Sequence, residues 1–282
     1  MTNNLYNILV PISFSQKDKW AIAKAIELSN ALHCHIHFVH VVPMFPVPSF
    51  LFGAELFFAN TFAKAEDAGK KLKELQKKYQ YHLCGNGKIE ISVLHGYPQA
   101  ALKKYVEYYG IDMVIKGLPK FNFVQRVFSS VSISVLARKI NIPVLAINAS
   151  GLVSHFKKIL LPVNTHVPLR RIRIAVILGR YFKSTIYVLS LRKTGDNNFS
   201  LLNTTLEVIQ SLTSIPIQSI ILEGKNLAEA TFDFSKKINA DLIMISHKKE
   251  FFLPGLWNTI TKKLLSYKSK IPVLTVADDT AA

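Results

Sequence analysis

Short apolar runs rich in β-branched residues alternate with longer stretches of helical periodicity along the 282-residue chain. This alternation predicts right-handed βαβ units and a parallel sheet that is covered by helices on both faces. In the first half, the runs predict strands at residues 6–11, 35–41, 89–94, 112–116 and 143–147, with helices at 17–32, 60–80, 98–109 and 129–140. In the second half, they predict strands at 157–162, 185–190, 216–222, 241–245 and 272–276, with helices at 168–182, 200–213, 227–238 and 257–268.

The two halves of the chain also repeat one another. Three segments of the first half recur in the second in the same order: ILVP (8–11) as ILLP (159–162), GIDMVIKG (110–117) as NADLIMIS (239–246), and NIPVLAI (141–147) as KIPVLTV (270–276). An ordered set of matches of this kind predicts a duplicated domain. The predicted organisation is a first domain at residues 1–148, a linker of mostly small and polar residues at 149–155, and a second domain at 156–282.

The spacing of these repeats places an insertion in the first half. The offset between partners falls from 151 residues at ILVP to 129 residues at the two later matches, so 22 additional residues lie between the first and fourth strands. Within this region, residues 43–58 contain three prolines and a cluster of bulky apolar side chains. Such a segment suits a lid over a ligand site, an apolar patch for another chain, or a loop folded onto its own domain.

Composition narrows the class of protein. Apolar residues make up 49% of the chain, which is enough for a full core and excludes a disordered protein. No uninterrupted run of 18 apolar residues and no signal-peptide pattern is present, so we expect neither a membrane span nor a membrane partner. The two cysteines, Cys34 and Cys84, predict neither a disulfide framework nor a zinc cage, as is typical of the reducing cytoplasm.

The formal charge of +17 raises the question of a nucleic-acid partner. Residues 1–150 contain 17 basic and 9 acidic groups, and residues 151–282 contain 18 and 9, so the charge is spread evenly. Even spreading indicates a solvated basic surface rather than a basic arm, and nucleic-acid binding is the least favoured interpretation.

At this point the sequence resembles a tandem universal stress protein. In the first half, the resemblance lies in the strand-then-proline opening ILVPISFS, the strand ending FVHVV, the step HGYP, the strand DMVIKG and the closing IPVL. The second half repeats the opening, Gly224, DLIMIS and IPVL. The resemblance implies two repeated α/β domains, each an open five-stranded parallel sheet with helices on both faces, of the Rossmann-like, adenine-nucleotide alpha hydrolase-like class. It also implies antiparallel pairing of strands 143–147 and 272–276 in an internal pseudo-dimer.

Nucleotide-binding members of that family carry an acid two residues after the opening proline and a glycine-rich loop, G-x2-G-x9-G-[ST], after the fourth strand. The glycines let backbone N–H groups approach the phosphates. Here Ser13 and Asn164 stand where the acid is expected. Gly117 keeps the first glycine, whereas Lys120 and the pair Ser129-Ser130 replace the others, and the second half has Ser246, Lys249 and Asn258-Thr259. The nucleotide signature is therefore degraded in both halves, and more so in the second.

Two candidate sites follow from this resemblance. The first, for a nucleotide or another anion, comprises Val10, Pro11, Ser13, His40, Val41, Gly117, Lys120, Ser129 and Ser130. The second, which we interpret as vestigial, comprises Pro162, Asn164, Ser246, Lys249, Asn258 and Thr259. No residue is assigned a catalytic role, because no Ser-His-Asp or Cys-His arrangement is evident.

The favoured hypothesis is a cytoplasmic, non-enzymatic, stress-associated regulatory or binding protein without a bound cofactor. Its partners would be the second domain of its own chain, a second copy in a homodimer, or a protein that the sequence does not identify. The alternative is an adenine-nucleotide-binding protein or weak ATPase that uses the first site.

A histidine-rich strand is a further candidate, for a metal site. His33, His35 and His37 alternate within HCHIHFVH (33–40), so that they share one face of a strand at a spacing of about 7 Å. However, no carboxylate lies close in the sequence, and helices are expected to cover that strand. We therefore predict no metal.

Overall fold

A computed structural model describes residues 6–44, 54–118, 136–137, 139–149, 151, 155–163, 166–192, 198–224, 227–246 and 271–276. The chain forms two compact units. The first unit is Leu5–Gly117, and the second contains the described residues after Gly117.

Each unit alternates strands with helices, as the hydrophobic pattern predicts. The first unit contains β1 (Asn7–Pro11), α1 (Gln16–Leu32), β2 (His35–Val42), α2 (Ala54–Gln80), β3 (Ile89–His95), α3 (Pro98–Tyr109) and β4 (Met113–Gly117). The second unit contains β5 (Val144–Ile147), β6 (Lys158–Pro162), α5 (Leu169–Phe182), β7 (Thr185–Leu191), α6 (Asn198–Leu212), β8 (Ile217–Leu222), α7 (Leu227–Lys237), β9 (Leu242–Ser246) and β10 (Val273–Val276).

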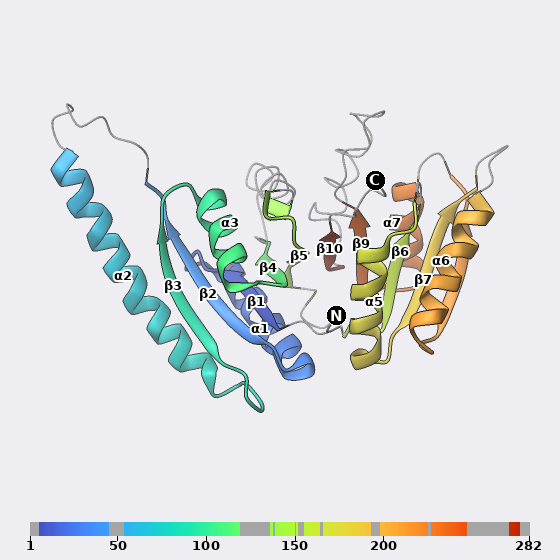
Figure 1. Ribbon diagram of the computed structural model, residues 1–282, viewed down its shortest axis with the longest axis horizontal. Coiled ribbons are helices and arrows are strands. Elements are labelled where there is room, and N and C mark those ends of the chain that lie inside the picture. Colours follow the sequence, from blue (N-terminus) through green and yellow to red (C-terminus); the bar gives the residue numbers. More distant parts are fainter. Residues whose placement is uncertain are drawn as a thin grey trace. The chain divides into compact units, whose positions relative to one another are not determined.

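The α/β class with a mostly parallel sheet is confirmed. In the first unit the strand order is β3-β2-β1-β4, and in the second unit the order β8-β7-β6-β9-β10 begins in the same way. The neighbours within these two series run parallel where their register is given. Figure 1 shows helices lying alongside the strands of each unit. The carboxyl ends of β1 and β4, and of β6 and β9, therefore meet at one edge of each sheet.

The antiparallel pairing predicted for the two closing strands is confirmed. β5 pairs antiparallel with β10, with Leu145 opposite Leu274 and Val144 opposite Thr275. All four residues of each strand are buried, which agrees with the apolar sequences VLAI and VLTV. Because β10 ends the parallel series of the second unit, its antiparallel ladder with β5 covers an edge that would otherwise be exposed.

The inserted residues lie between β2 and β3. This connection spans residues 43–88, whereas the corresponding connection between β7 and β8 spans 192–216 and is 21 residues shorter. Much of the difference is helix, because α2 has 27 residues and α6 has 15. The sequence pattern placed the start of this helix at residue 60, but α2 begins at Ala54. Residues 45–53, which hold most of the proline-rich segment, lie outside the described residues, as does most of 129–140 and all of 257–268.

Local sequence signals explain where α3 begins and ends. Pro98 occupies its first turn, where a missing backbone N–H costs no helical hydrogen bond. Gly110 ends the helix in the left-handed conformation, with φ of 58°, and its N–H donates to the Val106 carbonyl. Glycine adopts this conformation without a steric penalty, so the sequence YYGID fixes the turn into β4.

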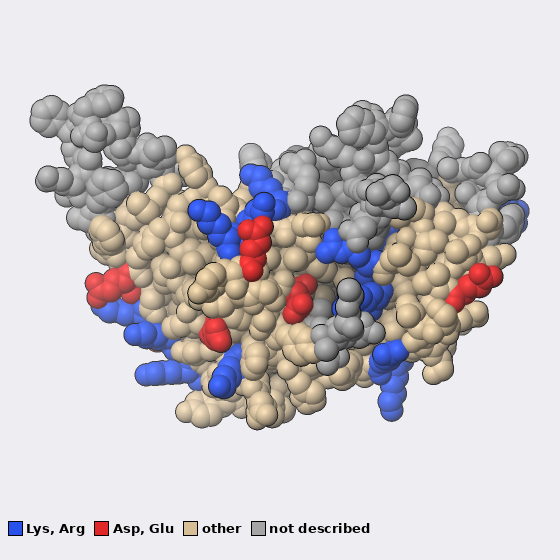
Figure 2. All heavy atoms as spheres, viewed as in Figure 1, with Lys and Arg blue, Asp and Glu red and all other residues tan. Residues whose placement is uncertain are grey.

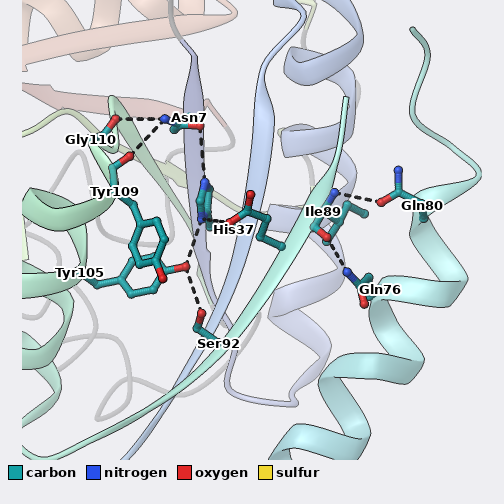
Figure 3. Close-up of polar contacts among 10 residues, drawn as sticks. Asn7, His37, Gln76, Gln80, Ile89, Ser92, Tyr105, Tyr109 and Gly110 are labelled. Carbon is teal, nitrogen blue, oxygen red and sulfur yellow. Dashed lines mark hydrogen bonds and ion pairs between the residues drawn. The ribbon is translucent and has the colours of Figure 1, made fainter. Parts of the chain in front are cut away.

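Side chains of α2 bind the backbone at the outer edge of β3. Gln76 Nε2 donates to the Ile89 carbonyl at 2.6 Å, and Gln80 Oε1 accepts the Ile89 N–H at 2.9 Å (Figure 3). Gln80 Nε2 also donates to the Gly87 carbonyl at 3.1 Å. The long helix is thus tied to the strand by hydrogen bonds as well as by apolar packing.

Among the described residues, no helix is both long and apolar enough to cross a membrane.

Cys34 and Cys84 differ sharply in environment, and this leads to a prediction about their reactivity. Burial raises the pKa of the Cys34 thiol to about 12, with a further contribution from the Asp112 carboxylate, whereas Cys84 is exposed. Because the thiolate is the reactive form, we expect iodoacetamide at pH 8 to alkylate Cys84 alone in the folded protein. Intact-mass measurement should show one adduct in buffer and two in urea. A Cys84→Ser variant that still gains an adduct in buffer would contradict this assignment.

Candidate functional site

Six of the nine residues predicted for the first site lie within the first unit, at the carboxyl ends of three neighbouring strands. They are Val10, Pro11, Ser13, His40, Val41 and Gly117. Val10 and Gly117 are buried, Pro11, His40 and Val41 are partly buried, and Ser13 is exposed. The other three, Lys120, Ser129 and Ser130, lie outside the described residues.

A buried carboxylate organises the turn that follows β1. Asp18, on the first turn of α1, has a residue exposure of only 5%. Its side chain accepts the backbone N–H of Ser13 at 2.8 Å, the backbone N–H of Ser15 at 2.9 Å and the Ser13 hydroxyl at 3.0 Å. Three donors at the end of the strand and the start of the helix are therefore already bound by the protein itself.

Gly117 is required by a close approach of α1. A Cβ at position 117 would lie 2.0 Å from the carbonyl oxygen of Lys17 and 2.6 Å from its carbonyl carbon. Real Cβ atoms do not approach a backbone so closely, so only glycine fits here. The family resemblance predicts that this glycine allows a phosphate to approach. In the structure, its bare face is in contact with the backbone of α1.

His40 and Phe14 lie together above the end of β2. His40 Nδ1 donates to the Ile12 carbonyl at 2.8 Å, which ties β2 to the turn after β1. The Phe14 ring lies 4.7 Å from the His40 ring, and the Lys71 ammonium of α2 lies 5.7 Å from the Phe14 centroid. Phe14 has a positive φ of 55°, which is unfavourable for a bulky residue. The surrounding contacts therefore hold Phe14 in a strained position beside the predicted site.

A cationic pair also belongs to this region. Lys116 is the penultimate residue of β4, and Lys17 lies in the first turn of α1. Burial, together with the nearby Lys17 charge, lowers the pKa of Lys116 to about 8, while the Asp18 carboxylate acts in the opposite direction. Part of the Lys116 population is therefore uncharged at mildly alkaline pH.

The second candidate site is less completely described. Pro162 ends β6 and is buried, and Ser246 ends β9 and is partly buried, whereas Asn164, Lys249, Asn258 and Thr259 lie outside the described residues. The structure adds Arg171 of α5, which is buried and whose Nη1 donates to the Pro162 carbonyl at 2.7 Å. A guanidinium thus binds the last carbonyl of the strand on which this site would be built.

Five residues that shape these turns are not among those predicted from the sequence: Phe14, Lys17, Asp18, Lys116 and Arg171. Asp18 had a readable signal, because serine followed three residues later by an acid is typical of a helix start, and Ser15 and Asp18 have this spacing. The role of Arg171 had no such signal, because a basic residue near a helix start is usually exposed.

The histidine-rich strand does not gather metal ligands in the structure. His33 precedes β2 as the C-cap of α1 and is exposed, whereas His37 is buried in the strand. Among the described residues, no three His, Cys, Asp or Glu side chains lie close enough to hold a metal ion.

Among the described residues drawn in Figure 2, basic side chains do not form one continuous patch within either unit. There, the lysines and arginines of the described residues are interspersed with acidic and uncharged side chains. Some of the basic groups are paired along α2, such as Lys70 with Glu66 and Lys71 with Asp67. On this face, the distribution favours a solvated basic surface over a track for nucleic acid.

The role of Asp18 can be tested by removing its carboxylate. Hydrogen bonds to a charged group contribute roughly 1.5–3 kcal/mol each, although they are not additive. We expect Asp18→Ala to lower the free energy of unfolding by about 2–3 kcal/mol in urea denaturation. Asp67→Ala removes a carboxylate from an exposed pair on α2 and should change stability by less than about 0.5 kcal/mol. Equal effects of the two substitutions would show that Asp18 does not organise the turn.

The contact at Gly117 predicts that alanine substitutions at two glycines, Gly117 and Gly69, will change stability in opposite directions. Gly117→Ala forces the start of α1 away from β4 and should destabilise the protein by about 2 kcal/mol or more. Gly69→Ala, in α2, meets nothing within 4 Å and should stabilise by roughly 0.5–1 kcal/mol, because alanine favours a helix interior. Thermal unfolding of the two variants tests both signs. A neutral Gly117→Ala would mean that α1 is not held against β4.

Comparison with known proteins places this arrangement in a family. The sequence model of the Universal stress protein family matches residues 5–148. A universal stress protein from Archaeoglobus fulgidus DSM 4304 has a similar structure, with 15% identity and a TM-score of 0.70 over 96% of this chain and 98% of that chain. A functionally unknown protein from Pseudomonas aeruginosa PAO1 is 17% identical, with a TM-score of 0.60 over 98% and 94%.

The fold alone does not determine the role. The cytoplasmic domain of a prokaryotic cation chloride cotransporter is also similar, with 12% identity and a TM-score of 0.56 over 97% of this chain and 96% of that chain. A search of curated proteins found no match. The match to the family extends over half of the sequence and includes every element of the first unit, from β1 to β4. On this basis, the chain belongs to the universal stress protein family.

Proposed function

We propose that this protein is a non-enzymatic, stress-associated regulatory or binding protein, whose first candidate site takes adenine nucleotides weakly or not at all. The observation that carries the proposal is the buried Asp18 carboxylate, which accepts hydrogen bonds from Ser13 and Ser15. A helix start normally offers unpaired N–H groups and a positive dipole end to an anion. Here the negatively charged Asp18 side chain, in the first turn of α1, already binds the N–H groups that lead into the helix.

The contacts of the neighbouring residues point in the same direction. The Ser13 hydroxyl, which stands where nucleotide-binding relatives carry an acid, is hydrogen bonded to Asp18 and Ser15. The free face of Gly117 is covered by the Lys17 backbone. A phosphate that approached these atoms would have to displace hydrogen bonds and packing within the protein before it gained its own.

The second candidate site is proposed to be vestigial. Arg171 is buried against the end of β6 and donates to the Pro162 carbonyl. A ligand that needed this carbonyl, or the space beside it, would have to move a buried guanidinium, and an unpaired buried charge is costly.

One observation favours the alternative, an adenine-nucleotide-binding protein or weak ATPase. Lys17 and Lys116 are close enough to repel one another at the meeting point of α1 and β4. Two ammonium groups in one place attract an anion, and a phosphate would relieve their repulsion. For this alternative to hold, the binding free energy from contacts between the lysines and a phosphate must exceed the free energy lost when the hydrogen bonds of Asp18 are broken.

We further propose that the chain is a tandem form, with two domains of the same fold in an internal pseudo-dimer. The shared strand orders, β3-β2-β1-β4 and β8-β7-β6-β9, support a duplication. The antiparallel ladder between the two closing strands, β5 and β10, supports the internal pairing. We also propose that a second copy of the chain, in a homodimer, or another protein acts as its partner.

Isothermal titration of the full chain with ATP tests the proposed function. Because the protein's own groups occupy the turn after β1, we expect no saturable binding with a dissociation constant below about 1 mM. An Asp18→Asn variant, which removes the competing charge but keeps a similar shape, should bind ATP more tightly than the wild type. Phosphate release should stay at the rate of buffer alone in both proteins.

Micromolar binding of ATP by the wild type, at one or two sites per chain, would contradict this proposal and support the alternative. If Lys116→Met then abolished that binding, the lysine pair would be identified as the anion site. Lys73→Met, in α2, is the matched control for the loss of one positive charge elsewhere.

A further inference from the structure

A chain of side-chain hydrogen bonds crosses the first unit from β3 to α3 and β2, away from the candidate sites. Ser92 Oγ lies 3.1 Å from the hydroxyl of Tyr105, and this hydroxyl lies 3.1 Å from Nδ1 of His37 (Figure 3). His37 and Tyr105 are only 3% and 5% exposed. These buried polar groups therefore depend on one another for their hydrogen bonds.

The chain continues from β2 to β1 and back to the end of α3. His37 Nε2 lies 3.5 Å from Asn7 Oδ1, at the outer limit of a hydrogen bond. The amide nitrogen of Asn7 donates to the carbonyls of Tyr109 and Gly110, at 3.2 and 3.3 Å. Asn7 thus turns its oxygen toward His37, as Figure 3 shows, and connects the histidine to the last residues of α3.

These contacts define the tautomer of the neutral His37 ring. An amide oxygen can only accept, so Nε2 of His37 carries the proton that faces Asn7. In the neutral ring, Nδ1 is then an acceptor, and the Tyr105 hydroxyl donates to it while accepting from Ser92. A protonated His37 would reverse this direction, because Nδ1 would carry a proton. The Tyr105 hydroxyl could then no longer donate to the ring and would have to turn its own proton toward Ser92.

Charged and titratable groups reach His37 from three sides. From β3, the Glu90 carboxylate lies 3.6 Å from Nδ1 and is half exposed to solvent. From α3, Tyr105 and Tyr109 contact the imidazole with their rings. From β2 itself, His35 adds a repulsive interaction. Beyond Asn7, the Asp112 carboxylate accepts the Asn7 backbone N–H at 2.9 Å.

The environment as a whole keeps His37 neutral. Burial lowers its pKa below the usual value of 6.5, Glu90 opposes this effect, and His35 adds to it. Because the pKa in the folded state lies below the pKa in the unfolded state, the stabilisation from neutral His37 is fully present above pH 6.5. It is lost as the pH falls below 6.5 and through the lower folded-state pKa.

We propose that the protonation of His37 controls how firmly α3 is held against the sheet, and we call this arrangement a latch. In the neutral state, it accepts from Tyr105 and holds the helix through that hydroxyl and through Asn7. In the protonated state, Nδ1 donates to Glu90, whose carboxylate moves inward from solvent, and the Tyr105 hydroxyl loses its acceptor. The carboxyl-terminal half of α3 then loosens. The proton comes from solvent and returns to it, so the step needs no other reactant.

Titration of the histidine ring signals by NMR in the full chain tests the direction of these hydrogen bonds. Tyr105→Phe removes the donor to the neutral ring and should raise the pKa of His37. Glu90→Gln removes the acceptor for the charged ring and should lower it. His82→Gln, at an exposed histidine, should leave the His37 signal unchanged. A lower His37 pKa in Tyr105→Phe would mean that the tyrosine accepts from His37, and it would overturn the latch.

Hydrogen–deuterium exchange tests the movement of the helix. After correction for the intrinsic rate, amides near residues 103–109 should lose protection severalfold between pH 7.5 and pH 5.5, whereas amides of α2 near residues 68–76 should not. His37→Gln can accept from Tyr105 and donate to Asn7 at every pH, so its α3 protection should not depend on pH. Should that variant fail to fold, Glu90→Gln should shift the loss of protection to lower pH. Wild-type protection that stays constant over this pH range would contradict the proposal.

Discussion

The contact between Gly117 and the backbone of Lys17 is the constraint on which the turn after β1 depends. Because no Cβ stands at position 117, the carbonyl of Lys17 can lie against the end of β4. This places the first turn of α1 where the Asp18 carboxylate reaches the N–H groups of Ser13 and Ser15. Gly117, which resembles a glycine of a phosphate-binding loop, thus allows α1 to pack against β4. The anion at the start of α1 is the Asp18 carboxylate of the protein itself.

The periodicity of apolar residues predicted most of the strands and helices, because strand composition and helix-ending residues are visible in the sequence. The strands β4 and β9 are apolar almost throughout, which only a strand covered on both faces can accommodate. The turn from α3 to β4 follows from Gly110 alone. The start of α2 was placed six residues late, because the apolar and aromatic residues after Ala54 read as part of a loop that prolines begin.

The candidate site was harder to predict, because its character depends on distances that no sequence pattern contains. Family spacing predicted that Ser13 and Gly117 belong to one site, and they lie at the ends of the neighbouring strands β1 and β4. It did not indicate that Asp18 would bind Ser13 or that Lys17 would cover Gly117. The alternation of His33, His35 and His37 was considered as a possible metal site. The partners of His37 come instead from α3, β1 and β3, which are distant in the sequence.

The two units solve the same packing problem with different residues. Counted back from the left-handed C-caps His33 and Lys183, Arg171 of α5 occupies the place of Ala21 in α1, and both are buried. The second unit thus places a guanidinium, which binds the end of β6, at the helix position where the first unit has a methyl group. In the aligned strands, Ile245 stands in place of Lys116 and Ser246 in place of Gly117. The two units thus place these basic groups at different positions, although the order of their strands is the same.

The glutamines of α2 have a consequence for how the protein behaves at high concentration. A strand at the edge of a sheet can recruit a strand from another molecule, because its outward backbone groups are ready partners. At Ile89, both of these groups are already bound, the carbonyl by Gln76 and the N–H by Gln80. A strand from another molecule that approaches β3 must therefore either leave Ile89 unpaired or displace the side chains of Gln76 and Gln80. The long helix α2 therefore also disfavours aggregation through the edge of β3.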